Sequence, residues 1–415
     1  MKQDSTVEPD AQAVTYETLE RFVRGKAQEF IQELLEAEVT ELLGRGRSER
    51  RAPVDAPPGY RNGHGEPRQL TLGSGTVTLQ RPRVRGLEER FESRVLPLFV
   101  RRTNEVSDLL PQLYLHGLSE GDFDLALRGL LGEKAPLSAS TVARLKGKWQ
   151  TELAEWNARR LDELEVVYLW VDGVYVKAGL EDRKAALLVA VAALSDGRKV
   201  VLAVQSGQRE STESWTRLLR DLKARGLRWP RLVIGDGHLG LWAALRNVYP
   251  EAEEQRCWNH RILNVLDRIG RRDQAGAKEL LDKIAYAATR EAAERAKATF
   301  QRWCQERAYE DAGRLLDEDW ERMVTFFGFP QAHWTHLRTT NPVESPFAAL
   351  RLRTAAAKRF KKVENATAVI WKLLLVGERK FQRLHAPELL VEVWNGAQFL
   401  NGIRVEPQPE DAAAY

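Results

Sequence analysis

Three acidic residues of this chain lie in sequence contexts that suit one kind of active site. Asp172 follows an apolar run at 166–171. Asp236 ends a second apolar run at 232–235, and Glu344 lies at the mouth of a predicted helix. Carboxylates that approach one another repel unless a cation lies between them, so the three acids predict a divalent-metal site. Two Mg²⁺ ions held in this way can activate a water or a 3′-hydroxyl on a phosphodiester, which is the chemistry of cutting and joining DNA.

Each acid also has an ordinary structural explanation. Asp172 and the glycine after it lie between two apolar runs, which is a signal for a hairpin turn. Asp236 and its following glycine fit the end of a strand before a helix. Asn341 as N-cap, the proline at N1 and Glu344 at N3 form a capping-box pattern. On the residues alone, both interpretations of each acid remain open.

The region around the first two acids has the pattern of alternating strands and helices. We expect strands at 166–171, 174–178, 184–194, 199–204 and 231–235, and a helix at 239–248. A helix before the last of these strands carries its apolar residues on one face: Trp215, Leu218, Leu219 and Leu222. Three strands followed by alternating helix and strand predict an α/β sheet of mixed direction. Sites in such sheets form at strand ends, which is where Asp172 and Asp236 lie.

The C-terminal half is mainly helical. A short strand at 254–258 precedes a helical stretch that runs to residue 327. Glu344 then opens a last helical region with basic residues and no acid among them: Arg351, Arg353, Lys358, Arg359, Lys361 and Lys362. Such a stripe is useful beside a carboxylate site if the substrate is a polyanion. The alternative is a basic face that is simply solvated.

The N-terminal part combines helices with a hairpin. Residues 16–43 have the spacing of one amphipathic helix or two, and the alternation over 69–80 predicts a β-hairpin. Helices at 118–131 and 137–149, joined by a Gly/Pro turn, suit a helix-turn-helix. Ser119 would cap the first of these helices, and Ser138 or Ser140 the second. Residues of the second helix that can contact phosphates or bases are Thr141, Arg144, Lys146 and Lys148. An ordinary helical hairpin is the alternative.

The bulk composition indicates an intracellular protein with several domains. The chain has 415 residues, of which 43% are hydrophobic, and this is enough for about two to four domains. The net charge of +4 says little about a nucleic-acid partner by itself. The two cysteines exclude a disulfide scaffold and fit a reducing cytosol. We find no secretory signal and no apolar stretch of the roughly 20 residues that a membrane helix needs, so we expect a cytoplasmic location.

Two common cofactor sites are not favoured. Cys257 and His260 have the residue types of metal ligands, but a structural zinc site needs four ligands and no second pair lies at suitable spacing. The other cysteine, Cys304, is isolated in a predicted helix. The sequence has no P-loop motif, so nucleotide hydrolysis is not expected.

Four segments in a fixed order resemble the signatures of the bacterial Mutator-type (IS256 family) transposases. They are 172–177, 235–241, 255–265 and 337–345. The resemblance extends to 60–63, 76–85, 351–354 and 359–360, and so covers most of the chain. Each motif alone would be weak evidence, but together they are highly specific. One departure is His64, where relatives often carry tyrosine, and it affects no catalytic position.

The resemblance implies an RNase H-like α/β core with a DDE triad, interrupted by an all-helical insertion. Asp172, Asp236 and Glu344 correspond to the triad. Cys257 and His260 match a C-x-x-H element that lies near the catalytic centre and shapes it or contacts DNA. His238 also matches the family pattern, beside the second acid. The resemblance further implies two Mg²⁺ ions, replaceable by Mn²⁺, and action as a homodimer or larger assembly on double-stranded DNA.

We therefore expect an insertion-sequence transposase that binds terminal inverted repeats and joins DNA strands, through a copy-out route with a circular intermediate. The alternatives are a catalytically silent, transposase-derived repressor and a junction resolvase on the same core. The expected regions are a disordered tail (1–13), a DNA-binding and dimerisation region (14–103), a helix-turn-helix (104–160), the first part of the core (165–258), the insertion (259–335), the last part of the core (336–385) and a C-terminal tail (386–415). The residues expected to contact DNA are Ser140, Thr141, Arg144, Lys148, Arg351, Arg353, Lys361 and Lys362.

Overall fold

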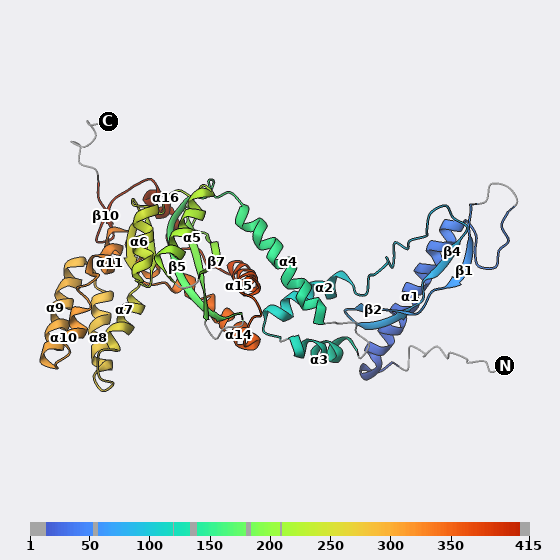
Figure 1. Ribbon diagram of the computed structural model, residues 1–415, viewed down its shortest axis with the longest axis horizontal. Coiled ribbons are helices and arrows are strands. Elements are labelled where there is room, and N and C mark those ends of the chain that lie inside the picture. Colours follow the sequence, from blue (N-terminus) through green and yellow to red (C-terminus); the bar gives the residue numbers. More distant parts are fainter. Residues whose placement is uncertain are drawn as a thin grey trace, which may run out of the picture. The chain divides into compact units, whose positions relative to one another are not determined.

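The structure of the chain is a computed structural model (Figure 1). It describes residues 14–52, 57–118, 120–132, 139–179, 184–207 and 210–406. The chain divides into two compact units, Met1–Leu145 and Lys146–Tyr415. The boundary falls within helix α4 (Ala139–Ala158), and each unit is considered by itself.

The N-terminal unit is built on one long helix packed against a hairpin. Residues 16–43 form a single helix, α1 (Tyr16–Leu43), and the predicted hairpin is confirmed as β2 (Arg68–Leu72) and β3 (Gly75–Leu79). A second antiparallel pair joins β1 (Tyr60–His64) to β4 (Pro82–Arg85). The apolar residues that pack between α1 and the hairpin are Leu35, Leu70, Val77, Leu79 and Leu96.

The helices predicted for a helix-turn-helix are present. Helix α2 (Asn104–Leu115) precedes α3 (Glu120–Leu131), and α4 follows. The predicted cap Ser119 and the connection at 133–138, which includes Ser138, lie outside the described residues. The prediction ended the second helix at residue 149, but α4 continues to Ala158.

The second unit contains a five-stranded mixed sheet, as the sequence predicts. Its strands are β5 (Val166–Lys177), β6 (Lys184–Leu194), β7 (Lys199–Gly207), β8 (Leu232–Gly235) and β9 (Glu253–Arg256), in the order β7-β6-β5-β8-β9. Strand β6 runs antiparallel to both of its neighbours, whereas β5, β8 and β9 run parallel. The runs 166–171 and 174–178 belong to one continuous strand, so the interpretation of Asp172 as part of a hairpin turn is wrong.

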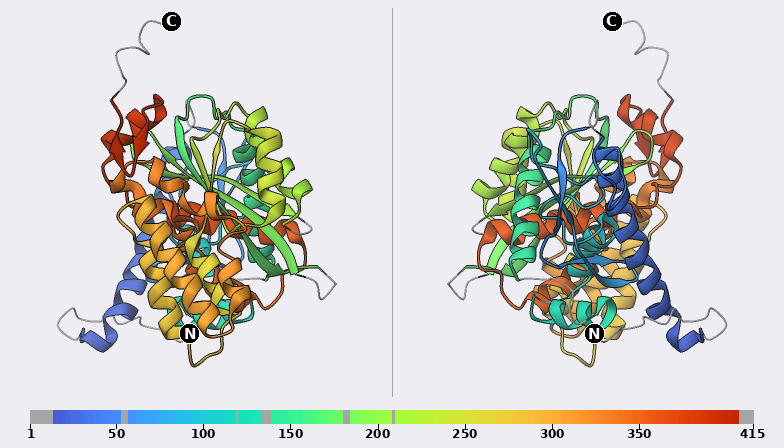
Figure 2. Two further views of the ribbon diagram at one scale, coloured as in Figure 1. Left: turned by 90° about the vertical axis from the view of Figure 1, so that its left-hand side faces the viewer. Right: turned by 90° about the vertical axis from the view of Figure 1, so that its right-hand side faces the viewer.

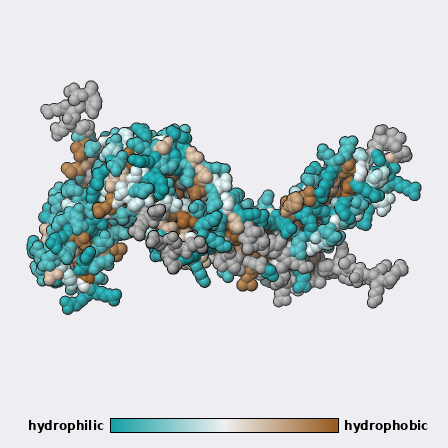
Figure 3. All heavy atoms as spheres, in the orientation of Figure 1, coloured by the Kyte–Doolittle hydropathy of each residue, from teal (hydrophilic) through white to brown (hydrophobic). Residues whose placement is uncertain are grey.

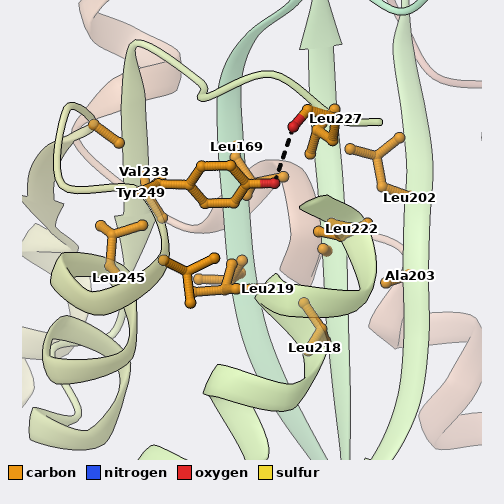
Figure 4. Close-up of a cluster of buried hydrophobic side chains, with 14 of the residues drawn as sticks. Leu169, Leu202, Ala203, Leu218, Leu219, Leu222, Leu227, Val233, Leu245 and Tyr249 are labelled. Carbon is orange, nitrogen blue, oxygen red and sulfur yellow. Dashed lines mark hydrogen bonds between the residues drawn. The ribbon is translucent and has the colours of Figure 1, made fainter. Parts of the chain in front are cut away.

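Two helices cover one face of this sheet. They are α5 (Thr212–Ala224) and α6 (Leu239–Val248), and the four apolar residues predicted for one face of α5 are all buried. Figure 4 shows this core, in which the ring of Tyr249 lies among leucines and its hydroxyl donates to the carbonyl oxygen of Leu227 at 3.2 Å.

The opposite face of the sheet carries helices from the end of the chain. Helix α15 (Val363–Glu378) packs on β7, and α16 (Pro387–Trp394) packs on β5. Helix α13 (Asn341–Glu344) packs on β5 and β6, and α14 (Phe347–Ala357) contacts α13 and α15. The short elements η3 (Gln331–His333) and α12 (Trp334–Leu337) lie on the same face. The hydroxyl of Tyr168 lies 2.8 Å from Nδ1 of His333, and the indole of Trp170 donates to the carbonyl of His336 at 2.9 Å. The sheet is therefore the middle of three layers.

The segment after β9 is helical, as predicted. Its elements are α7 (Trp258–Leu266), α8 (Gln274–Ala285), α9 (Arg290–Glu306), α10 (Glu310–Arg314), α11 (Trp320–Val324) and η2 (Thr325–Gly328). Figures 1 and 2 show α8, α9 and α10, coloured yellow to orange, gathered beside one another outside the sheet. Helix α11 and η2 attach this group to the edge strand β9.

The segment predicted as a C-terminal tail from residue 386 contains regular secondary structure. Its described residues include α16 and a small hairpin of β10 (Phe399–Leu400) and β11 (Ile403–Arg404). Leu390 and Val393 of α16 are buried, because the apolar positions of this helix face the sheet. On the face drawn in Figure 3, the surface is mostly hydrophilic with small separate apolar patches. Among the described residues, no helix has both the length and the apolar character needed to cross a membrane.

Candidate active site

The parallel strands bring two of the predicted acids to one edge of the sheet. Trp170 of β5 pairs with Ile234 of β8. Asp172 and Asp236 each follow two residues later, so they reach the same edge on neighbouring strands. Cys257 comes directly after β9, whose register with β8 carries it next to Asp236. The sheet register thus assembles one side of the candidate site from residues that are far apart in the sequence.

Asp172 is a buried carboxyl in an acidic environment. It is 9% exposed, and its Oδ1 accepts a hydrogen bond from the amide of Gly173 at 2.7 Å. Burial, together with the charges of Asp236 and Glu344, raises the pKa of Asp172 to about 7, while the bond from Gly173 and the charge of His260 oppose the shift. The negative charge of this carboxylate therefore has too little compensation from the protein alone.

Asp236 starts a tight loop between β8 and α6. Its Oδ1 accepts a hydrogen bond from the amide of His238 at 3.0 Å. His238 is the N-cap of α6, and its Nδ1 accepts from the amide of Gly240 at 3.2 Å. The exposed ring of His238 is therefore oriented by its role as a helix cap, beside the second acid.

The loop of Asp236 rests on a buried ion cluster. Gly237 has a φ of 100°, and a Cβ at this position would collide with the side chain of Arg256. Arg256 and Arg261 both bind the carboxylate of Asp319, which lies just before α11. Asp319, which belongs to the helical segment, thus fixes Arg256 under the turn that carries Asp236.

Glu344 is positioned by side chains around Thr340. The predicted cap Asn341 is wrong, because it is the first residue of α13 and Thr340 is the N-cap. The hydroxyl of Thr340 hydrogen-bonds to the Glu344 carboxylate and also lies 3.2 Å from Sγ of Cys257. The amide of Thr340 donates to the same sulfur at 3.3 Å. His260 completes the cluster, with Nδ1 at 3.5 Å from the hydroxyl and 3.8 Å from Oε1 of Glu344.

These contacts describe a hydrogen-bonded cluster better than a zinc site. Ligand atoms of Cys257, His260 and Glu344 lie within 4.8 Å of one another, which is close enough for one metal ion. A structural zinc site needs four ligands, however, and here the hydroxyl of Thr340 hydrogen-bonds within the same group. The side chains are satisfied by one another, and this supports the interpretation that Cys257 and His260 shape the site.

His260 supplies a positive charge to this acidic environment. Its hydrogen bond with Cys257 raises the pKa of His260 to about 9; burial opposes this shift, and the charges of Glu344 and Asp172 add to it. At neutral pH the ring is therefore an imidazolium beside Glu344. One positive charge is insufficient to balance three carboxylates.

Sequence reasoning missed three residues at this edge. Glu210 is 5% exposed; burial raises the pKa of its carboxyl and the charge of Asp236 raises it further. The hydroxyl of Tyr175 hydrogen-bonds to Glu210, and burial together with this bond raises the pKa of Tyr175 to about 12. Glu210 lies in a polar segment before α5 without any pattern that could identify it. Thr340 belongs to a motif that was recognised in the sequence, but its hydrogen bond to Glu344 is seen only in the structure.

The residues predicted to contact DNA through α4 differ in exposure. Arg144 and Lys148 are exposed, as DNA contacts must be. Thr141 is buried, which argues against the contact predicted for it. The side chain of Ser140 lies outside the described residues.

The basic region after Glu344 is not one helical stripe. Arg351 is exposed on α14, but Arg353 is 2% exposed and its guanidinium is not accessible, so the contact predicted for Arg353 is not supported. Lys361 and Lys362 are exposed in the connection between α14 and α15. The amide of Phe360 in this connection donates to a carbonyl oxygen at the end of β5 at 2.9 Å. The two lysines are therefore held near the strand that carries Asp172.

Comparison with known proteins identifies the family. The sequence matches the family described as "Transposase, Mutator family" over residues 2–383. It is 42% identical over 306 residues to the transposase for insertion sequence element IS6120 of Mycolicibacterium smegmatis, which covers 74% of this chain and 94% of that protein. It is 38% identical over 280 residues to the transposase for element IST2 of Acidithiobacillus ferrooxidans, covering 67% of this chain and 94% of the relative.

Two further matches are more distant. The transposase for IS256 in transposon Tn4001 of Staphylococcus aureus is 26% identical over 346 residues, covering 83% of this chain and 86% of the relative. Among solved structures, a chain of the Drosophila P element transposase strand transfer complex matches with a TM-score of 0.28 and 12% identity, over 68% of this chain and 83% of that one. A TM-score this low does not establish a common fold. The family match over most of the sequence and the close insertion-sequence relatives place the chain in the Mutator family of transposases.

Proposed function

We propose that this chain is an insertion-sequence transposase that cleaves and joins DNA through Asp172, Asp236 and Glu344. The observation that carries the proposal is the parallel register of β5 and β8, which brings the first two acids to one edge of the sheet. Helix α13, which ends at Glu344, packs on β5, and the charge of Glu344 raises the pKa of Asp172; both observations support the assignment of the third acid to the same site. The mixed order of the five strands supports an RNase H-like core.

The donor set fits a divalent metal. Burial and the charges of Asp236 and Glu344 raise the pKa of Asp172 to about 7, so a cation bound between these carboxylates would stabilise the ionised form of Asp172. The three acids would hold Mg²⁺, and Mn²⁺ would substitute because both accept carboxylate oxygen ligands. When bound, Mg²⁺ supplies the acidity that makes a water or a 3′-hydroxyl nucleophilic and the charge that stabilises the leaving oxygen.

The protein residues orient the acids and balance charge. The sheet backbone fixes Asp172 and Asp236, while Thr340 restrains the carboxylate of Glu344. The imidazolium of His260 adds a positive charge at 3.8 Å from Glu344, which favours the approach of a polyanion. Cys257 supports this ring and Thr340 together, so it is a positioning residue.

The exposed basic residues are suited to DNA. Lys361 and Lys362, next to the end of β5, and Arg351 on α14 would bind backbone phosphates near the acids. On α4, Arg144 and Lys148 would read the terminal inverted repeats, together with Ser140. Each phosphate contact releases counterions, so DNA binding should weaken steeply as salt increases. Two ends must be processed together, so we propose a dimer on DNA and a copy-out route through a circular intermediate.

Strand transfer with a pre-cleaved end that bears the cognate repeat tests the proposal. The wild-type protein should join this end to target DNA in Mg²⁺ or Mn²⁺, and Asp236→Asn should bind the repeat without joining it. If the two proteins joined ends equally well, or if neither joined them, catalysis by these acids would be refuted. Repeat binding without joining by the wild type would favour the silent repressor.

A further inference from the structure

Helix α1 carries apolar residues on two faces. One face packs on the hairpin of β2 and β3 through residues such as Leu35, which is fully buried. The other face is exposed to solvent, and its large apolar residues are Tyr16, Leu19, Val23, Phe30 and Leu34. Phe30 is 60% exposed and Tyr16 is 92% exposed. Removing such a row of apolar side chains from water is favourable, so this face is a candidate contact surface.

The exposed row has the spacing of a coiled coil. In a seven-residue repeat, positions a and d alternate at steps of three and four residues and form one stripe along a helix. The d positions of α1 and two of its a positions are apolar: Tyr16, Val23, Phe30 and Ala37 at d, and Ala27 and Leu34 at a. The other a positions, towards the two ends of the stripe, are Glu20 and Glu41. A stripe of this width is covered by one further helix.

The charges of α1 are divided along its length. Every charged residue after Ala27 is acidic, whereas the three basic residues of the helix all lie before it: Arg21, Arg24 and Lys26. Two parallel copies of α1 would place their acidic parts side by side. Two antiparallel copies place the basic part of each beside the acidic part of the other. The helix is therefore complementary to a second copy of itself in the antiparallel direction.

Two charges beside the stripe select one register. Lys26, which also contacts Glu29 at 2.9 Å, and Glu33 are exposed and occupy g positions, which face one another across an antiparallel pair. When Phe30 packs against Ala27 of the second copy, each Lys26 faces a Glu33. A shift by one seven-residue repeat puts Lys26 opposite Lys26 in one direction and Glu33 opposite Glu33 in the other. Since like charges repel, the first register is favoured.

We propose that the exposed face of α1 pairs with the same face of a second copy of this chain, as an antiparallel coiled coil of two helices. The inference rests on the proposed function, which needs two copies to process two DNA ends, and it names the surface that joins them. The same register brings Tyr16 to Glu41 of the second copy, where the phenol donates to the carboxylate at the end of the stripe.

Single cysteine variants test the direction of pairing, since both native cysteines are buried. In the antiparallel register Val23 lies opposite Leu34 of the second copy. Coexpressed Val23→Cys and Leu34→Cys chains should therefore give a disulfide-linked dimer under mild oxidation, and neither variant should do so alone. A linked dimer of Leu34→Cys alone would show parallel pairing. No linked dimer, with or without repeat DNA, would show that something else covers this face. Either result overturns the proposal.

Sedimentation velocity of the full chain without DNA measures the strength of the pair. The wild type should be dimeric, and Phe30→Glu should be monomeric with an unchanged circular dichroism spectrum, because this side chain is exposed. The matched control is Leu125→Glu on α3, where the leucine is 75% exposed, and this variant should remain dimeric. A monomeric wild type or a dimeric Phe30→Glu would refute the proposed surface.

Exchanging the flanking charges tests the register. Lys26→Glu and Glu33→Lys should each weaken dimerisation by about tenfold, because each puts like charges opposite one another twice. The variant that carries both changes restores opposite charges and should dimerise nearly as well as the wild type. A double variant as weak as the single variants would refute the register.

The pairing can be judged separately from catalysis. Asp236 belongs to the other unit, so Asp236→Asn should leave the linked dimer of the two cysteine variants unchanged. Linked dimers that transfer no strands would overturn the role of the acids and support the pairing of α1. Strand transfer by chains that give no linked dimer would overturn the pairing alone.

Discussion

The two sides of the proposed active site hold their acids by different means. On the sheet side, Asp172 lies within strand β5 and Asp236 follows strand β8, and backbone pairing of the two strands sets their relative position. On the helix side, Glu344 ends a helix of four residues, and the hydroxyl of Thr340 restrains its carboxylate. Many backbone hydrogen bonds fix the positions of the two aspartates, whereas only a few side chains orient Glu344.

This difference predicts how a substitution on each side would affect the site. A substitution on the sheet side changes the chemistry of one acid but leaves its backbone in place. A substitution in the cluster of Thr340, Cys257 and His260 leaves the Glu344 carboxylate chemically unchanged but less well oriented. Loss of charge and loss of orientation should therefore be separable by experiment.

Removing a carboxylate from either side should have the largest effect on activity. Asp172→Asn and Glu344→Gln should each lower the rate of strand transfer by at least about a thousandfold, because both remove a proposed metal ligand. The stabilities should differ, since Asp172→Asn also removes a buried charge and should raise the metal-free unfolding temperature. Single-turnover joining and thermal unfolding measure the two effects. Near-wild-type joining by either variant would remove that acid from the site.

The ion cluster under the Asp236 loop should control stability. Asp319→Asn leaves the buried guanidinium groups of Arg256 and Arg261 without their carboxylate, so the free energy of unfolding should fall by about 3–5 kcal/mol. The matched control is Glu318→Gln, since Glu318 is 62% exposed and lies 3.5 Å from Arg261; its cost should be below about 1 kcal/mol. Denaturant unfolding measures both. Equal losses would show that burial of the cluster does not determine its contribution.

Thr340→Val tests the helix side with little change of shape. Loss of the hydroxyl frees the Glu344 carboxylate and should slow strand transfer by about tenfold to a hundredfold, which is the usual cost of removing a group that orients a metal ligand. Thr340→Ser keeps the hydroxyl and should restore most of the rate. Comparable rates for the valine variant and the wild type, or a serine variant as slow as valine, would show that Thr340 does not orient Glu344.

Local sequence patterns predicted most of the elements but not how they pair. Helix α6 lies at the predicted residues because a polar loop precedes it and its apolar residues recur at helical spacing. The continuous strand through Asp172 was divided in the prediction, because a glycine after an acid is also a turn signal. The strand order is set by contacts between segments that are distant in the sequence, and the local hydrophobic periodicity carries no information about such contacts.

The sequence points to the three acids of the proposed triad, whereas the residues that support them could not be predicted from it. Asp172 and Asp236 follow apolar runs that predict buried strands. Glu210 has no such context, and its place follows from the close approach at Gly173. Arg353 was predicted at the surface because arginine is mostly exposed, but packing of α14 buries it. The helix cap was assigned to Asn341 because asparagine is a strong capping residue, although Thr340 takes that position.

The dependence of metal-free stability on pH also distinguishes the two sides. Burial raises the pKa of Asp172 from 3.8 to about 7, so its contribution to stability is complete below about pH 4 and is lost as the pH rises to about 7. The pKa of His260 is raised from 6.5 to about 9 by its bond with Cys257, so its contribution is complete below about pH 6.5 and is lost by about pH 9.

Denaturant unfolding in the presence of a chelator should therefore show a free energy that falls in two successive pH windows. Asp172→Asn should abolish the lower window, and His260→Gln the upper one. Addition of Mn²⁺ should remove the decrease in the lower window, because the metal binds the ionised carboxylate of Asp172 and stabilises the folded chain. A lower window that persisted in Asp172→Asn would mean that another buried acid, such as Glu210, dominates the sheet side. If the free energy of unfolding of His260→Gln still fell in the upper pH window, the ring of His260 would not be the positive charge of the helix side.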